Sequence, residues 1–250
     1  MPVIESFSEH ILTLEISRPE RRNTLDAAML SELTAAFEKA STDEDVRVVV
    51  LCAQPGIFCA GGDLTEQIKD LNADEDSPSG RMLAALSGCT KPVIACVEGP
   101  AVGLAVTMLY YCDLVYAGSR ALFSLPFTAL GLTPRFGVSF LAAASCGLHK
   151  AAEKILLSEP ITAQEALSMG IVSGVLDDAQ VKEQTLARAS RLAKLSPLAV
   201  QSSKRVLRSS LQEALLAMQK IEAQTFNEVA RSEQAKEACD AFLEGRMPKF

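Results

Sequence analysis

The 250-residue sequence predicts an α/β fold, with a parallel sheet covered by helices and followed by a helical C-terminal region. Two apolar runs, residues 46–51 and 93–97, are rich in β-branched side chains and have the composition of strands buried on both faces. A glycine-containing turn follows each run, and the second turn leads directly into a helical pattern. Strand, crossover, strand and glycine turn are the connections of a right-handed α/β core.

The first half of the chain alternates between strand and helix patterns. Residues 11–16 alternate like a half-buried strand that ends before Pro19. Asp26 is an N-cap for the helix that follows. The apolar face of that helix comprises Leu30, Leu33, Phe37 and Ala40. The remaining elements expected here are a loop over residues 54–62, helices over 80–86 and 104–112, and a third strand over 113–117.

Helical patterns dominate after residue 124. Ser196 followed by Pro197 is typical of a helix start, and we expect this helix to run through Arg208. Ser232 is expected to cap a further helix that reaches Phe242. Because no internal repeat or long linker is visible, we divide the chain into an α/β core, residues 1–195, and a helical C-terminal region, residues 196–250.

Charge and hydrophobicity argue against several classes of partner. The net charge is −7, and no run of basic residues is longer than Arg21-Arg22, so we expect neither nucleic acid nor an anionic membrane surface as a partner. Residues 1–15 do not resemble a signal peptide, and no stretch of ~20 apolar residues occurs. We therefore expect a cytoplasmic protein.

The cysteines and histidines do not suggest a disulfide framework or a metal site. The seven cysteines are scattered and mostly lie in apolar stretches, so we expect them to be reduced core residues. The only histidines are His10 and His149, and no CxxC pair occurs. We therefore expect no metal.

Two glycine loops are the best candidates for a ligand site. Ligands of open α/β sheets bind beyond the carboxyl ends of the strands, and the loops 58–64 and 99–104 follow two such ends. Two backbone N–H groups aimed at one point would stabilise the oxygen of an attacked or enolised thioester, and losing one donor costs ~3–4 kcal/mol. On composition alone, simple connecting turns remain the stronger alternative.

These loops and several other segments resemble the crotonase (enoyl-CoA hydratase/isomerase) superfamily over nearly the whole chain. The matching segments are residues 17–26, which begin Ser17-Arg18-Pro19; Phe58-Cys59-Ala60-Gly61-Gly62-Asp63-Leu64; residues 91–95 with Gly99-Pro100-Ala101-Val102-Gly103-Leu104; residues 161–166 with 170–172; and residues 242–250. The resemblance implies a ClpP/crotonase-like spiral of ββα units with a helical C-terminal trimerisation region. Residues 99–104 and 126–134 are most similar to the branch that isomerises 3-enoyl-CoA to 2-enoyl-CoA.

The resemblance assigns roles to individual residues. It makes the N–H groups of Ala60 and Leu104 the oxyanion donors. The proposed contacts with coenzyme A, the only cofactor expected and part of the substrate, are Arg18, Arg21, Arg22, Ala60, Gly61, Gly62, Asp63, Leu64 and Lys249. The proposed acyl pocket is Phe127, Leu130, Leu132 and Arg135. A solvated turn is an equal alternative for the arginines, core packing is an equal alternative for the apolar residues, and capping of the next helix is favoured for Asp63.

The usual catalytic acids of the family are absent. Hydration or double-bond migration needs a group that moves a proton. The two hydratase positions hold Thr107 and Phe127, and the isomerase position holds Arg135. An acid from elsewhere, a different reaction and binding without turnover all remain open. The candidates for another acid are Glu98, Asp63 and Glu66, and Arg135 is a candidate partner for a substrate carboxylate.

Two functional hypotheses follow from the resemblance. The first is an enoyl-CoA isomerase/hydratase-type enzyme of fatty acid metabolism, which stabilises a thioester enolate in a backbone oxyanion hole. The second is an acyl-CoA-binding protein that has lost the acid and does not turn over enoyl-CoA. In both, the resemblance implies a homotrimer or a dimer of trimers.

Overall fold

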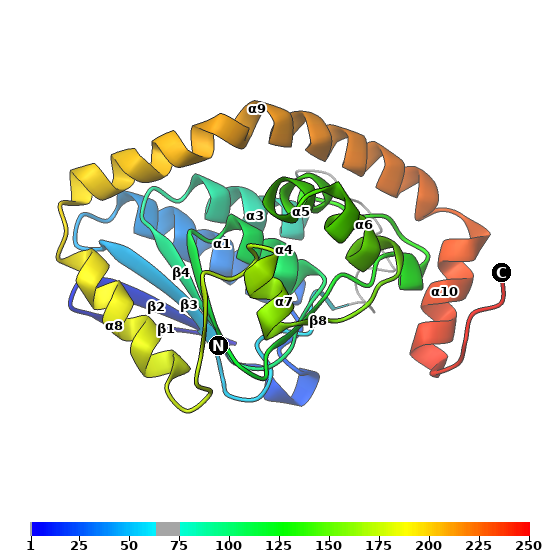
Figure 1. Ribbon diagram of the computed structural model, residues 1–250, viewed down its shortest axis with the longest axis horizontal. Helices are drawn as coiled ribbons and strands as arrows, with labels where there is room; N and C mark the ends of the chain where they lie inside the picture. Colours follow the sequence, from blue (N-terminus) through cyan, green and yellow to red (C-terminus); the bar gives the residue numbers. More distant parts are fainter. Residues whose placement is uncertain (1, 64–75) are drawn as a thin grey trace.

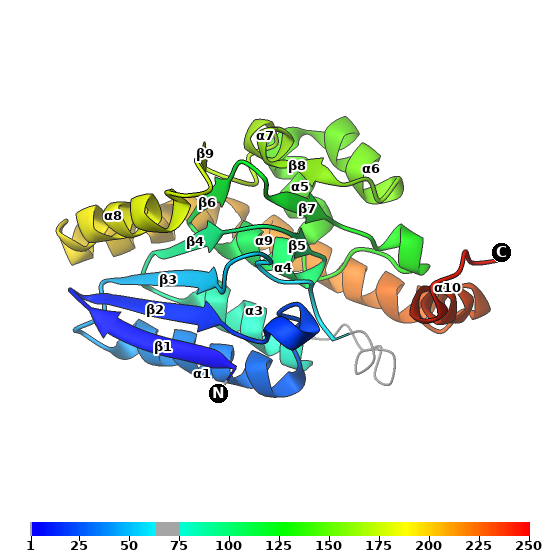
Figure 2. The same cartoon turned by 90° about the horizontal axis from the view of Figure 1, so that it is seen from below.

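The computed structural model describes residues 2–63 and 76–250, and within them the main sheet has six strands (Figures 1 and 2). In spatial order these are β1 (Val3–Ser8), β2 (Ile11–Ile16), β3 (Val48–Ala53), β4 (Val93–Val97), β6 (Leu114–Gly118) and β9 (Gly174–Leu176). The pairs from β2 to β9 are parallel, and β1 runs antiparallel to β2. The predicted α/β class is confirmed.

A second, smaller sheet and the helices surround this sheet. The small sheet contains β5 (Ala101–Val102), β7 (Leu122–Ser124) and β8 (Ile161–Thr162). The α-helices are α1 (Ala27–Thr42), α3 (Pro78–Gly88), α4 (Leu104–Tyr111), α5 (Val138–Cys146), α6 (Leu148–Leu156), α7 (Ala163–Ser168), α8 (Val181–Ala193), α9 (Pro197–Val229) and α10 (Glu233–Glu244). The 3-10 turns are η1 (Pro19–Arg21) and η2 (Thr128–Leu130). No helix of the described residues is both long and apolar enough to span a bilayer.

Strand β3 shows why the central strands are apolar throughout. Val49 and Leu51 pack in the main core with α1 and α3, whereas Val48 and Val50 pack against α8 on the other face. The predicted run began two residues too early, because the ladder with β2 begins at the pair Ile11 and Val48. All seven cysteines are free, and all except the half-buried Cys146 are buried, as expected for core residues.

Strand β1 was not predicted. Its burial pattern gives the reason, since only Val3 of its six residues is buried and no alternation marks it as a strand. Glu9 and His10 join it to β2 with positive φ angles of 50° and 65°, the conformation of a two-residue hairpin turn that matches strand twist.

Helix α9 is much longer than predicted. It begins at Pro197 after the Ser196 cap, as expected, but it continues for 33 residues to Val229 instead of ending at Arg208. No glycine or proline occurs between residues 198 and 229, so nothing in the local sequence ends the helix. In Figure 1 it arches over α3, α4 and α5 and leads into α10. Helix α10 then packs against η2.

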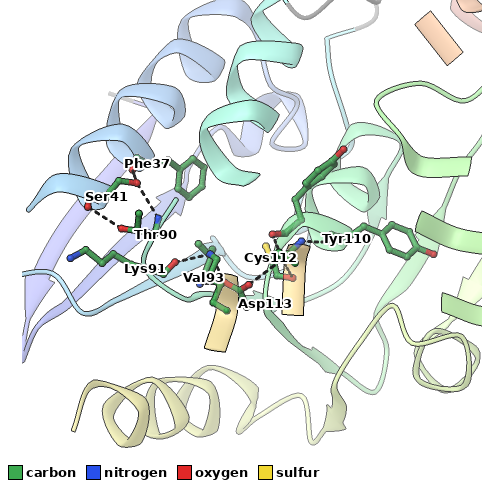
Figure 3. A network of polar contacts seen from close by, with 11 residues as sticks. Phe37, Ser41, Thr90, Lys91, Val93, Tyr110, Cys112 and Asp113 are labelled. Carbon is green, nitrogen blue, oxygen red and sulfur yellow. Dashed lines mark hydrogen bonds and ion pairs between the residues drawn. The ribbon is translucent and has the colours of Figure 1, made fainter. Parts of the chain in front are cut away.

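A polar network anchors α9 to the core at the end of α4, and Figure 3 shows its core residues Val93, Cys112 and Asp113. The carboxylate of Asp113 accepts a hydrogen bond from the Val93 N–H at 2.8 Å and pairs with Lys204 at 2.7 Å and Arg208 at 3.1 Å. Arg208 also donates to the carbonyl oxygens of Tyr111 and Cys112 at 2.6 and 2.9 Å. Asp113 was expected to lie in the third strand but precedes it, and its side chain has this anchoring role.

Candidate active site

The structure brings the two predicted glycine loops together. The Cys59 N–H donates to the Pro100 carbonyl at 3.1 Å, and the Val102 N–H donates back to the Cys59 carbonyl at 3.0 Å. Gly61 has a φ of 95°, and a methyl group added there would lie 2.8 Å from the Val102 oxygen and 3.8 Å from the Leu104 nitrogen. Glycine at this position therefore permits both the backbone conformation and the close approach of the loops.

Ala60 does not have the role that the resemblance gave it. Its N–H donates to the Arg22 carbonyl at 3.1 Å, so this hydrogen is already used within the protein. Gly62, two residues later, forms a parallel bridge with Leu25. The residues on either side of Gly62 make the hydrogen bonds of this bridge. The Leu25 N–H donates to the Gly61 carbonyl, and the Asp63 N–H donates to the Leu25 carbonyl.

The N–H group of Gly62 points away from Leu25, because consecutive N–H groups of an extended strand point to opposite sides and the Asp63 N–H already points toward Leu25. No described residue accepts a hydrogen bond from the Gly62 N–H. Gly62 therefore replaces Ala60 as the first candidate donor.

Leu104 keeps its expected position at the second loop. It is the first residue of α4, and its N–H is one of the helix-terminal groups that have no acceptor within the helix. No residue in the described ranges accepts from it. The partial positive charge of a helix N-terminus adds to the attraction of this N–H for a negative oxygen.

The turn that holds the three arginines lies against the first glycine loop. Leu25 and Asn23 connect the two segments, through the bridge to Gly62 and a hydrogen bond from the Asn23 amide to the Ile57 carbonyl at 2.8 Å. Arg21 and Arg22 are exposed on this turn. They are therefore near the loop and open to a phosphate-bearing ligand.

Arg18 has a structural role. Its guanidinium pairs with Asp26 at 3.1 Å and with Asp63 at 3.6 Å, and it donates to the Thr24 carbonyl at 3.2 Å. Only 18% of its side chain is exposed, so these contacts and not a CoA phosphate account for its position. We remove Arg18 from the proposed phosphate ligands.

The structure places Asp63 and Lys249, two of the other proposed CoA contacts, but does not describe Leu64. Asp63 pairs with Arg18, and the prediction that it caps the following helix concerns residues outside the described part of the chain. Leu64 lies outside it as well. Lys249 is exposed in the tail, where its N–H donates to Glu237 on α10 at 2.8 Å.

The proposed acyl-pocket residues do not form one cluster. Leu132 packs with Phe226 of α9, and Leu130 lies against the same cluster. Phe127 packs in the main core, although its carbonyl accepts the Leu132 N–H at 2.8 Å. Arg135 places its Cζ atom 4.7 Å from the centroid of the Phe226 ring.

None of the three family acid positions offers a proton relay. Thr107 is buried, and its hydroxyl donates back to the Gly103 carbonyl at 3.3 Å. Phe127 is apolar. Burial lowers the pKa of Arg135 to about 10, so its side chain is still a cation at neutral pH.

The other acid candidates are not better placed. Burial raises the pKa of Glu98, and the charge of Lys182 opposes that shift. Because Lys182 belongs to α8, Glu98 is oriented toward the α8 face of the sheet, whereas α4 lies on the α1 and α3 side. Glu66 lies outside the described residues.

Nothing in the sequence indicates that Glu222 is a buried carboxylate that binds the start of α5. This buried residue of α9 accepts hydrogen bonds at the start of α5 from the Gly137 N–H at 2.5 Å, the Ser139 N–H at 2.9 Å and the Ser139 hydroxyl. Burial raises its pKa, and these three donors oppose the shift. No local signal reveals this contact, because its partners lie more than 80 residues earlier in the chain.

Comparisons with known proteins identify the family of the chain. The enoyl-CoA hydratase/isomerase family model matches residues 6–250. The 2,3-dehydroadipyl-CoA hydratase of Escherichia coli is 38% identical over 99% of this chain and 98% of its own length. Enoyl-CoA delta isomerase 2 of Rattus norvegicus is 31% identical over 96% of this chain and 62% of its own length.

Solved structures give the same result. An enoyl-CoA hydratase/isomerase from Pseudoalteromonas atlantica T6c superposes with a TM-score of 0.94 at 35% identity and covers 100% of both chains. Pseudomonas aeruginosa OdaA has a TM-score of 0.93 at 36% identity, over 97% of this chain and 98% of that one. The chain therefore has the crotonase fold and belongs to the enoyl-CoA hydratase/isomerase family.

Proposed function

We propose that the chain binds an acyl-CoA thioester and holds its carbonyl oxygen between the N–H groups of Gly62 and Leu104. The observation that carries the proposal is this pair of N–H groups, on two loops that hydrogen-bond to each other, without an acceptor among the described residues. Two donors aimed at one oxygen stabilise the charge of an enolate-like state more than that of the neutral carbonyl.

The coenzyme A moiety is proposed to lie along the first glycine loop. Gly61 and Gly62 have no side chains that would block its approach. Arg21 and Arg22 are proposed to face the phosphates, because both are exposed on the turn that binds this loop. Lys249 is kept as a further phosphate ligand because the tail leaves its side chain exposed.

The proposed reaction is of the enoyl-CoA isomerase or hydratase type, in fatty acid metabolism, with the proton carried by water or by an acid other than the usual three. A second candidate function is acyl-CoA binding without turnover. It is favoured by the Thr107 hydroxyl, which is directed to the Gly103 carbonyl, and by the buried Phe127, since neither side chain moves a proton.

Two variants of Leu104 test the oxyanion proposal directly. Leu104→Pro removes the N–H at the first helical position, where proline is tolerated, while Leu104→Ala shortens the side chain and keeps the N–H. We expect acyl-CoA to stabilise the alanine variant against thermal unfolding more than the proline variant. Equal stabilisation of the two variants would contradict a role for this N–H.

Turnover is tested with a panel of straight-chain 2-enoyl-CoA and 3-enoyl-CoA thioesters in ordinary and deuterated water, with products detected by mass spectrometry. We include 2,3-dehydroadipyl-CoA because the Escherichia coli relative is named for it. Double-bond migration, hydration or deuterium uptake next to the thioester supports the enzyme, with a roughly 10²–10³-fold slower reaction for Leu104→Pro. Thermal stabilisation without any product supports the binding protein.

We also propose that the chain assembles as a homotrimer or a dimer of trimers. Apolar side chains of α9 support an assembly, because Leu198, Val206 and Leu207 are 78%, 67% and 73% exposed in the single chain. Light scattering coupled to gel filtration is expected to give three or six times the 26.7 kDa mass of the chain. A monomeric mass would contradict this proposal.

A further inference from the structure

A cavity lies beneath α9, between this helix and the core that it arches over in Figure 1. Its volume is about 890 Å³, which is within the range of about 300–1,000 Å³ that is usual for small-molecule sites. Helix α9 forms one wall, and α3, the end of α4 and α5 form the other. Among the described residues, none that lines the cavity belongs to the two glycine loops, so the cavity is separate from the proposed thioester site.

One end of the cavity carries an excess of positive charge. Lys204 and Arg208 line it, and both pair with the single carboxylate of Asp113, at 2.7 and 3.1 Å. Arg205 lines the same end, is exposed, and has no acidic residue three or four positions away on α9. No aspartate or glutamate of the described residues lines the cavity itself. Three cations against one carboxylate leave an excess of two positive charges, so this end attracts an anion.

The cavity continues from this basic end into an apolar part. Leu211 and Leu215 line this part on α9. On the core side it is lined by Leu83, Phe136 and Leu141, which belong to the main core. Leu211 is 41% exposed in the single chain. A hydrocarbon chain that covers such side chains is stabilised by about 25 cal/mol for each Å² of apolar surface removed from water.

The dimensions of the cavity fit an extended chain of about nine or ten carbons. Arg208 and Leu215 are seven positions apart on α9, which corresponds to about 10 Å along the helix. Each bond of an extended chain advances about 1.2 Å, so about eight or nine bonds cover this distance. A helix about 10 Å across would fill the whole cavity with about two turns, so the cavity is too small for a longer helix of a second chain. Val206 and Leu207, which support the proposed assembly, do not line the cavity.

We propose that this cavity binds a medium-chain fatty acid, with its carboxylate at Arg205 and its hydrocarbon chain along α9 toward Leu215. The planar guanidinium of an arginine fits the two oxygens of a carboxylate. The ligand bridges α9 and the core beside the Asp113 anchor, so its binding stabilises the attachment of α9. This site goes beyond the proposed function and does not depend on the binding of a thioester at Gly62 and Leu104.

The test compares decanoate with 1-decanol, which has the same chain length without the charge. Calorimetry measures the binding of each, below the concentration at which decanoate forms micelles. Arg205→Gln removes the proposed contact with the carboxylate. Lys220→Gln is the matched control, because Lys220 is also exposed and lines the cavity but lies 12 positions beyond Arg208. Ala84→Trp places a large ring in the cavity from α3, where Ala84 is exposed. Circular dichroism and thermal unfolding of each variant report whether it is folded.

We expect the wild type to bind decanoate roughly tenfold more tightly than decanol, as one charge-assisted contact predicts. Arg205→Gln should lose most of this preference, Lys220→Gln should keep it, and Ala84→Trp should weaken the binding of both ligands. An unchanged preference in Arg205→Gln would overturn the proposal. Even if no variant folded, the wild type would overturn it by failing to bind decanoate or by binding both ligands equally.

Two further measurements on the wild type identify other occupants of the cavity or other sites for the acid. Competition between decanoate and hexanoyl-CoA would place the acid in the thioester site and overturn the proposal. A mass that falls in gel filtration when decanoate is added would mean that a second copy of the chain occupies the cavity, and would overturn it as well. Binding of decanoate without any binding of hexanoyl-CoA would instead overturn only the proposed function.

Discussion

Replacing Gly61 with alanine would force apart the two loops that carry the proposed donors. The φ of 95° alone costs about 1–2 kcal/mol for a residue with a side chain. The new Cβ would lie 2.8 Å from the Val102 oxygen, whereas carbon–oxygen contacts are ordinarily about 3.3 Å or longer. The loops must therefore separate by about half an ångström, and Leu104, two residues after Val102, would move with them.

The matched control is Gly147→Ala. Gly147 has a φ of 83°, and a methyl group there would meet no atom within 4 Å, so this variant has the backbone strain without the clash. Calorimetry with hexanoyl-CoA should show a roughly three- to tenfold weaker affinity for Gly61→Ala and no change for Gly147→Ala. If the two variants bind hexanoyl-CoA equally well, the reasoning about the loop contact is refuted.

Three further predictions concern charged side chains that stabilise the fold. Arg18→Met leaves the mostly buried carboxylates of Asp26 and Asp63 without their shared cation, so it should lower the free energy of unfolding in urea by about 2–4 kcal/mol. The control Arg21→Met changes an exposed arginine and should alter only acyl-CoA affinity. Equal stability of the two variants would count against the structural role of Arg18. Arg208→Met removes a cation that caps the carbonyl end of α4 and should lower the free energy of unfolding in urea by about 2–3 kcal/mol. A decrease under about 0.5 kcal/mol would contradict the anchoring role of Arg208. The Thr162 backbone N–H is the main cause that holds the pKa of Glu165 at about 2 instead of 4.5. Because the folded pKa is the lower one, this stabilisation is present above pH 4.5 and is lost as the pH falls toward 2. Glu165→Gln should therefore cost about 1 kcal/mol at pH 6, discounted for exposure, and less at pH 3, whereas a constant difference would contradict the assignment.

The elements that the sequence predicted well are those with a strong local signal. Strand β4 has the predicted bounds, and the Asp26 side chain caps α1 by accepting from the Met29 N–H at 2.9 Å. Burial on both faces makes a strand apolar along its whole length, and a cap needs only neighbouring residues. Strand β1, with one buried residue, lacks such a signal, as does the three-residue edge strand β9.

For the candidate site, the sequence indicated the two loops but not the hydrogen-bond partners of their backbone groups. The structure brings the two glycine loops together, because glycine at position 61 allows a close approach that any other residue would block, and their role as a ligand site stays a prediction. The donor at the first loop was assigned wrongly, because the acceptor of the Ala60 N–H is the Arg22 carbonyl, 38 positions earlier in the chain. The pairing of Arg18 with Asp63 depends on the same distant contact between the loops. Such partners follow from the folded arrangement and not from local sequence.

The measurement that tests the central claim most directly is the infrared stretching frequency of a thioester carbonyl labelled with carbon-13. Hydrogen bonds to the carbonyl oxygen weaken the C=O bond and lower this frequency. With labelled hexanoyl-CoA bound, the account predicts a lower frequency than in water for the wild type and for Leu104→Ala, and a smaller shift for Leu104→Pro. A bound wild-type thioester whose carbonyl frequency is the same as in water, or the same as in Leu104→Pro, would contradict an oxyanion hole formed by Gly62 and Leu104.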